Sequence, residues 1–262
     1  MANLHVTDYL ILPFGRAVKS DLQKISLSAV SADGLYFSTD VPVIFIRKSD
    51  KRPICLGDFD KHFGDLPDKL YDANDQTYLD YMCGTLKSNN PNMTPWEEQF
   101  LDLYFGTLGV LKAYTHNSSQ EDRGQIKHIE KEIGIGFPFH MFYKSPNDLW
   151  RALVPIPELQ LYVQDPLAEK KTYQPSNNFR VDYGFWNGEK LIAVEIDGAE
   201  PEGYAKDIRR DRLLRRAGVD VIHILNLELA KHKARALIEL LPRQFFGHDW
   251  DYEGEKPEAY PF

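Results

Sequence analysis

Two runs with alternating apolar and polar residues flank the pair Asn187-Gly188. Asn-Gly between such runs predicts a β-hairpin with a two-residue loop, because both central positions of a type I′ turn have positive φ. This loop would place Trp186 opposite Glu189. Alternation then puts six apolar side chains on one face of the hairpin, namely Val181, Tyr183, Phe185, Ile192, Val194 and Ile196.

The other face of the predicted hairpin carries three acids, Asp182, Glu195 and Asp197. In the predicted register, Asp182 and Glu195 are diagonal neighbours across the two strands. Carboxylates gathered in this way repel one another and are typical of a cation site. The alternative is a solvated strand face, although such faces normally mix acids with Lys, Thr and Ser.

Helical and strand-like patterns continue on both sides of the hairpin. Helices are predicted over residues 145–153, 204–218 and 227–241, and further strands over 159–164 and 219–226. A hairpin joins the second strand to the third, whereas a helix joins the third to the fourth. The expected fold class is therefore α/β (α+β), with a mixed four-stranded sheet and flanking helices in the C-terminal half.

The N-terminal half has weaker patterns. Strands are predicted over residues 9–13 and 41–47, a polar, turn-rich stretch over 65–91, and a buried helix over 94–116. We expect an N-terminal α+β domain of unknown fold. The predicted domain organisation is an N-terminal domain over 1–135, a second domain over 136–245, and an acidic, aromatic tail over 246–262.

Composition narrows the class of protein. The 262 residues, 43% of them hydrophobic, suit a globular chain of one large or two modest domains. No apolar run approaches the roughly 20 residues of a membrane span, and no secretory signal is evident, so we expect a cytoplasmic protein without a membrane partner. Cys55 and Cys83 lack metal-site spacing, and we expect reduced, structural thiols. The eight histidines also lack ligand spacing, and each is expected to be a satisfied surface or core residue.

The formal net charge of −8 is unevenly distributed along the chain. Residues 180–243 carry 12 Lys and Arg against 11 Asp and Glu. Within this segment, Arg209, Arg212 and Arg216 follow one another at helical spacing and form one stripe. Arginine binds phosphate through its planar fork, so the stripe is a candidate nucleic-acid contact. The alternative is a charged surface helix whose arginines pair with Asp207 and Asp211.

Together these residues resemble the PD-(D/E)xK nuclease superfamily, in particular its branch related to the very-short-patch repair endonucleases. The resemblance covers about residues 142–241 and rests on VDYGFW at 181–186, AVEIDG at 193–198, VDVIHILN at 219–226, and Asp207, Arg210, Leu214 and Gly218 at fixed offsets. It implies a restriction-endonuclease-like core. It also implies that Asp182 and Glu195 bind divalent metal, with Asp148 as the matching acid on the preceding helix.

The chain departs from the superfamily at the third signature residue, where Asp197 stands in place of lysine. The related branch commonly carries the same Glu-x-Asp-Gly pattern. Many relatives also have a histidine shortly after this pattern, and this chain has none there. Lys206 is the candidate for the missing cation, so the expected catalytic residues are Asp182, Glu195, Asp197 and Lys206.

The resemblance implies a Mg²⁺- or Mn²⁺-dependent endonuclease that hydrolyses phosphodiester bonds in nucleic acid, with DNA as the first candidate. Bacterial restriction, repair, transposition and antiphage defence are the expected settings. The alternative is a non-catalytic nuclease-fold subunit that binds nucleic acid or a protein partner, with the N-terminal domain or the tail as a docking surface. A third alternative is a small-molecule enzyme on an unrelated α+β fold.

Overall fold

The computed structural model describes residues 9–15, 25–31, 34–39, 42–64, 75–116, 150–163, 178–198, 204–227 and 229. Its central feature is a four-stranded sheet with the order β5 (Ile156–Tyr162), β6 (Asn178–Trp186), β7 (Leu191–Asp197) and β8 (Asp220–Leu225). The first three strands are antiparallel neighbours, and β8 is parallel to β7. Helix α5 (Tyr204–Arg216) connects β7 to β8. The predicted mixed four-stranded sheet within an α+β fold is confirmed.

The N-terminal half contributes two strand pairs and two long helices. Strands β1 (Tyr9–Pro13) and β4 (Val43–Arg47) pair antiparallel, and β2 (Ile25–Ser31) and β3 (Gly34–Thr39) form a separate pair. The remaining elements are η2 (Lys48–Asp50), η3 (Leu56–Asp58), α1 (Phe59–Phe63), α2 (Asp75–Asn89) and α3 (Pro95–His116). The predicted strands over 9–13 and 41–47 and the bounds of the predicted helix over 94–116 are confirmed to within two residues. The expectation that this helix is buried is wrong for one of its faces, where Trp96, Glu98 and Asp102 are exposed.

The turn-rich prediction for residues 65–91 is wrong from residue 75 onward, where α2 forms. Polar residues dominate this helix and hide its pattern. Its buried residues nevertheless repeat at helical spacing and include Tyr78, Leu79, Met82 and Leu86. A narrow apolar stripe that packs on neighbouring elements is enough to stabilise a helix that local composition does not favour.

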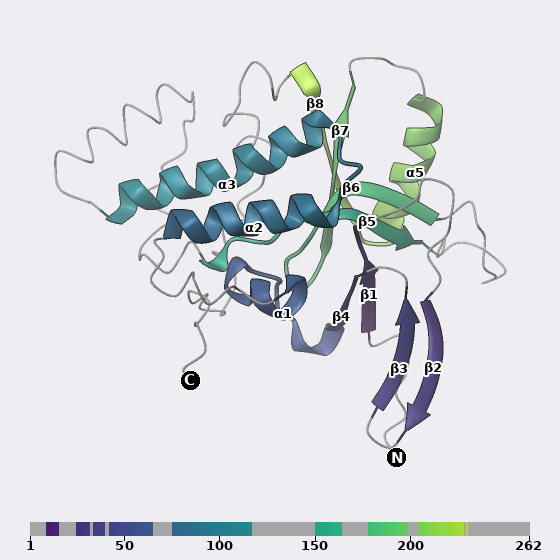
Figure 1. The fold of residues 1–262 in the computed structure, drawn as a ribbon. Coiled ribbons are helices and arrows are strands. Elements are labelled where there is room, and N and C mark those ends of the chain that lie inside the picture. Colours follow the sequence, from purple (N-terminus) through teal and green to yellow (C-terminus); the bar gives the residue numbers. More distant parts are fainter. Residues whose placement is uncertain are drawn as a thin grey trace, which may run out of the picture.

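Helices cover both faces of the sheet, with α2 and α3 on one side and α5 on the other (Figure 1). Aromatic side chains of β6 pack against α3. The ring centroids of Tyr183 and Phe100 are 4.7 Å apart, and those of Phe185 and Tyr104 are 5.7 Å apart. The Tyr183 hydroxyl also donates a hydrogen bond of 2.6 Å to the backbone oxygen of Glu97. The predicted apolar face of the hairpin is therefore buried beneath the N-terminal helices.

Backbone contacts also join the N-terminal half to the sheet. The amide of Ile54 donates to the Trp186 oxygen at 3.1 Å, and the Trp186 indole donates to the Arg52 oxygen at 2.9 Å. Buried apolar residues from both halves belong to one hydrophobic cluster. The division between residues 135 and 136 stays a prediction, because residues 117–149 lie outside the described part of the chain.

The β6–β7 hairpin has a different register from the predicted one. Trp186 pairs with Leu191 instead of facing Glu189, so the loop contains four residues. The side-chain oxygen of Asn187 accepts hydrogen bonds from the amides of Glu189 at 3.0 Å and Lys190 at 2.7 Å. The loop is thus closed by an asparagine side chain, in the manner of an Asx turn, and not by a type I′ turn.

This correction changes the pairing of the acids but not their face. The shift amounts to two residues, and side chains alternate with the same period, so each residue keeps its predicted side of the sheet. Continued by one residue beyond the Tyr183–Val194 pair, this register puts Asp182 opposite Glu195 instead of at its diagonal.

The structure describes only part of some other predicted elements. The strand predicted over 159–164 is β5, which begins three residues earlier and ends at residue 162. Of the helix predicted over 145–153, only residues 150–153 are described, and they form a short 3-10 turn followed by extended chain. The helix predicted over 227–241 lies outside the described residues apart from residues 227 and 229, and so does the tail.

The loop of this hairpin yields a stability prediction. Gly188 has a φ of +95°, and a Cβ there would lie 2.4 Å from the backbone oxygen of Lys51. Gly188→Ala should lower the free energy of unfolding by about 1–3 kcal/mol, measured by urea denaturation. Gly106→Ala is the control, because its site in α3 is exposed and has no atom within 4 Å of the new Cβ. The control should gain stability by about 0.5–1 kcal/mol. Equal stability of the two variants would contradict the described loop.

Candidate functional site

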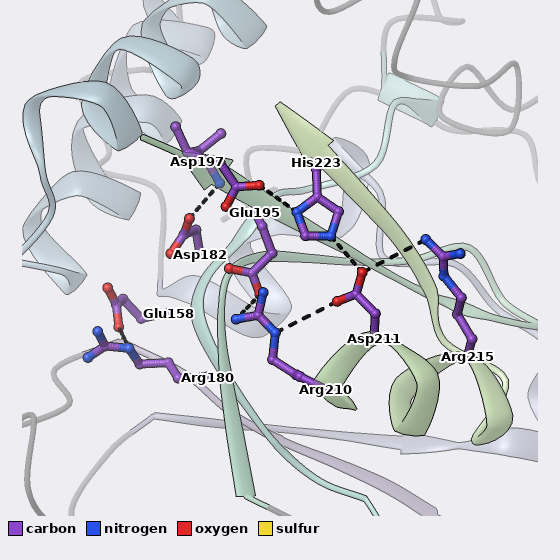
Figure 2. A network of polar contacts seen from close by, with 10 residues as sticks. Glu158, Arg180, Asp182, Glu195, Asp197, Arg210, Asp211, Arg215 and His223 are labelled. Atoms are coloured by element: carbon purple, nitrogen blue, oxygen red, sulfur yellow. Dashed lines mark hydrogen bonds and ion pairs between the residues drawn. The ribbon is translucent and has the colours of Figure 1, made fainter. Parts of the chain in front are cut away.

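A row of titratable residues crosses all four strands of the sheet, on the face opposite α3. Glu158 lies between two residues of β5 that pair with Tyr183 and Val181, so it lies opposite Asp182. Continued by one residue beyond the Tyr183–Val194 pair, the register of β6 with β7 puts Asp182 opposite Glu195. Glu195 pairs in turn with His223 of β8. Helix α5 lies over this row and contributes further charged side chains to it (Figure 2).

Asp182 lies half-buried in the middle of the row. Its Oδ2 accepts a hydrogen bond of 2.6 Å from the backbone amide of Ile196. Burial, together with the charges of Glu97 and Glu158, raises the pKa of Asp182 to about 7, against the lowering effects of the Ile196 hydrogen bond and of Arg180. Ionisation of Asp182 is therefore unfavourable unless positive charge is nearby.

Glu195 is buried beside Asp182. Its Oε1 lies 3.2 Å from Nη1 of Arg210, which reaches down from α5. Burial raises the pKa of Glu195 to about 8; the charge of Asp182 adds to this effect, and the charge of Arg210 opposes it. The half-buried Asp182 thus disfavours the ionised form of the buried Glu195 beside it.

Asp197 ends β7 on the same face, and its carboxylate is bound to a histidine. Its Oδ2 lies 2.6 Å from Nδ1 of His223, whose Nε2 lies 2.8 Å from Oδ2 of Asp211 on α5. The hydrogen bond to Asp197, followed by that to Asp211, raises the pKa of His223 to about 9, against the effect of burial. At neutral pH the histidine is consequently an imidazolium that donates from both ring nitrogens.

Helix α5 presents different residues to the sheet and to solvent. Arg210 and Asp211 face the sheet, and Arg215 Nη2 lies 3.9 Å from Oδ2 of Asp211. The expected pairing of this helix's arginines with its own acids is therefore confirmed for Asp211, whereas the side chain of Asp207 lies outside the described part. The three arginines of the predicted stripe, Arg209, Arg212 and Arg216, are all exposed.

Glu158 closes the row on the β5 side. It is buried, and its Oε2 lies 2.6 Å from Nε of Arg180. Its φ of +49° is uncommon for a residue with a side chain, and such strain is stored preferentially at functional sites. The sequence prediction missed Glu158, because the strand was expected to begin only at residue 159.

The structure brings together two of the predicted metal ligands, Asp182 and Glu195, and places the predicted catalytic Asp197 beside them. Asp148 lies outside the described residues, and so does the side chain of Lys206, whose backbone belongs to the first turn of α5.

Two further site residues were not predicted, Arg210 and His223. Arg210 appeared in the sequence only as part of a motif spacing. His223 is the one titratable residue in the run from 221 to 225, but its place beside Glu195 depends on a parallel register that no local pattern specifies.

The acids of the row suit a hard divalent cation. Mg²⁺ binds through one or two carboxylates and retains several waters, so Asp182 and Glu195 on adjacent strands provide a sufficient donor set. A cation would also offset the burial and the repulsion from Asp182 that together raise the pKa of Glu195. Among the described residues, no group of three or more His, Cys, Asp or Glu side chains could hold a metal. The fit is therefore to a two-carboxylate site.

The raised pKa values predict how stability depends on pH. The ordinary pKa values are 3.8 for Asp182, 4.5 for Glu195 and 6.5 for His223, and all three are higher in the folded protein. Between the unfolded and folded values the folded state binds more protons, so the free energy of unfolding should fall as pH rises. The two acids act from about pH 4 to about 8, and His223 from about 6.5 to about 9.

Urea denaturation in EDTA across this pH range is the measurement. Glu195→Gln should flatten the decline between about pH 4.5 and 8. Glu189→Gln, at the exposed turn of the same hairpin, should keep the parental profile. A parental decline that persists unchanged in Glu195→Gln would contradict the described environment of Glu195.

In the part of the chain that the structure covers, no helix is both long enough and apolar enough to cross a lipid bilayer. Comparisons of the chain with protein-family models, with curated proteins and with solved structures find no match.

Proposed function

We propose that this protein is a divalent-metal-dependent endonuclease that hydrolyses phosphodiester bonds, with DNA as the substrate and Mg²⁺ or Mn²⁺ as the cofactor. The position of Asp182 beside Glu195 on adjacent strands carries the proposal. Burial and the charge of Asp182 raise the cost of ionising Glu195, and a divalent cation offsets that cost. The resemblance of the surrounding sequence to the PD-(D/E)xK superfamily supports the same chemistry.

Each side chain of the site has a role in the proposed reaction. Asp182 and Glu195 would hold the metal, which supplies Lewis acidity toward phosphate oxygens and lowers the pKa of bound water. The amide of Ile196 orients Asp182 through its hydrogen bond to Oδ2. His223 donates both of its ring N–H groups to carboxylates, so it positions Asp197 and does not contact the substrate. Asp197 is then the candidate proton acceptor, and Lys206 the candidate cation near the attacking water.

The exposed stripe on α5, formed by Arg209, Arg212 and Arg216, supports nucleic acid as the substrate. It lies on the solvent side of the helix that carries Arg210 into the site, so a nucleic-acid backbone bound along the stripe would follow the outer face of α5. We place the activity in the cytoplasm, in bacterial restriction, repair, transposition or antiphage defence.

One observation favours a second function, that of a non-catalytic nuclease-fold subunit. Arg210 already pairs with Glu195, and His223 already links Asp197 to Asp211. In such a subunit these cationic side chains would stabilise the acids permanently, and the fold would serve to bind nucleic acid or a protein partner.

The two functions are separated by a cleavage assay with metal-site variants. Purified protein is incubated with plasmid, linear DNA and RNA in Mg²⁺, Mn²⁺ or EDTA. Asp182→Asn and Glu195→Gln should each reduce metal-dependent cleavage by at least about a hundredfold, because a bound metal supplies several kcal/mol of transition-state stabilisation. Glu189→Gln, at the far end of the same hairpin, is the control and should cleave at the parental rate. Parental cleavage by either site variant would refute the site, and absence of cleavage by the parent in every metal would favour the binding subunit.

The stripe is tested by the salt dependence of DNA binding, with Glu195→Gln in the background to stop turnover. Replacing Arg209, Arg212 and Arg216 together by Gln should weaken binding equally across DNA sequences. It should also reduce the slope of log K against log salt by up to roughly three phosphate contacts, at about 0.9 each. A triple replacement of the exposed cations Arg47, Lys51 and Lys190 is the control and should change the slope less. Equal slopes for the parent and the stripe variant would assign these arginines to another role.

A further inference from the structure

The Arg210 guanidinium and a divalent cation at the proposed metal site need the same carboxylate. Nη1 of Arg210 lies 3.2 Å from Oε1 of Glu195. Both side chains are largely removed from solvent, with 19% of Arg210 and 7% of Glu195 exposed. Screening by water is weak for such a pair, so the contact is a substantial electrostatic interaction.

The other cations on this face are engaged by other acids. Arg180 contacts Glu158, and His223 lies between Asp197 and Asp211. Arg215 contacts Asp211 and is largely exposed. In the part of the chain that the structure describes, Arg210 is therefore the cation in direct contact with Glu195, whereas Arg180 acts on Asp182 and His223 acts on Glu195 only from a distance (Figure 2).

We propose that Arg210 is an internal counter-ion that a divalent metal must displace from Glu195, so that α5 regulates metal loading of the site. The inference rests on the proposed function, because it requires the metal site formed by Asp182 and Glu195. A guanidinium and a divalent cation repel each other, and both need the lone pairs of the same carboxylate oxygens. Metal binding is then an exchange of one cation for another and not a simple addition.

The surroundings of Arg210 allow this exchange. Its Nε lies 3.8 Å from Oδ1 of Asp211, the next residue along α5. A small rotation of the side chain would bring the guanidinium closer to that carboxylate, which keeps its charge compensated after it leaves Glu195. In the metal-free protein Arg210 compensates the charge of Glu195. In the metal-loaded protein Arg210 contacts Asp211 instead, which reduces its repulsion with the metal.

Metal affinity in the absence of nucleic acid tests the proposal directly. Mg²⁺ binding to the full chain is measured by isothermal titration calorimetry at mildly alkaline pH, where carboxyl groups with raised pKa are ionised. Arg210→Gln should bind Mg²⁺ about tenfold more tightly, the effect expected when a competing charge-assisted contact is removed. Arg47→Gln is the matched control, since it removes the same charge from an exposed position on β4 outside the site, and it should bind as the parent does.

Two further variants keep the outcome decisive. Arg210→Lys retains the charge but loses the fork and part of the reach, so it should show a smaller gain in the same direction, and it provides the measurement if Arg210→Gln does not fold. Glu195→Gln should lose Mg²⁺ binding. If Glu195→Gln loses binding while neither Arg210 variant gains affinity, the counter-ion role is overturned and the proposed metal site stands. If Glu195→Gln binds Mg²⁺ as the parent does, the metal site and the counter-ion role fall together.

Discussion

The proximity of two acids, the half-buried Asp182 and the buried Glu195, is the constraint that organises this face of the molecule. Burial makes the ionised form of each unfavourable, and the charge of Asp182 makes that of Glu195 still more so. Positively charged or hydrogen-bond-donating groups from three elements contact the acids of this face. They are Arg210 of α5, His223 of β8 and the backbone amide of Ile196 in β7. A face built only for solubility would not concentrate acids where water cannot stabilise them.

The N-terminal half of the chain makes this face possible, although it contributes none of the acids in the row. Its helices cover the opposite side of the sheet through the aromatic contacts of Tyr183 and Phe185. Segment 51–54 also holds the hairpin loop, through the backbone of Trp186 and the close approach of Gly188. Residues more than 130 positions apart in sequence therefore fix the rigid strands on which the acids lie.

Local pattern predicted the strands and faces of the hairpin because alternation is a property of each strand alone. It predicted the wrong register because Asn-Gly is compatible with both a two-residue loop and the longer loop that the Asn187 side chain closes. Arg210 and His223 escaped prediction for a different reason. Their contacts with Glu195 and Asp197 depend on how a helix crosses the sheet and on which residues of parallel strands pair. The fold class could thus be predicted, along with the acids Asp182, Glu195 and Asp197, but not Glu158 or the cationic side chains that compensate these acids.

The side-chain pattern of β6 and β7 also determines which errors in their pairing register are tolerated during folding. A slip of two residues leaves Asp182 and Glu195 on their own side, as the difference between the expected and observed registers illustrates. A slip of one residue would turn either the acids toward the aromatic layer of Phe100 and Tyr104 or the apolar residues toward Arg210. Between the observed register and one shifted by two residues lies a register shifted by one residue, and that register would bury charged side chains among aromatic rings. The acids of the site therefore also disfavour a β6–β7 register that is shifted by one residue.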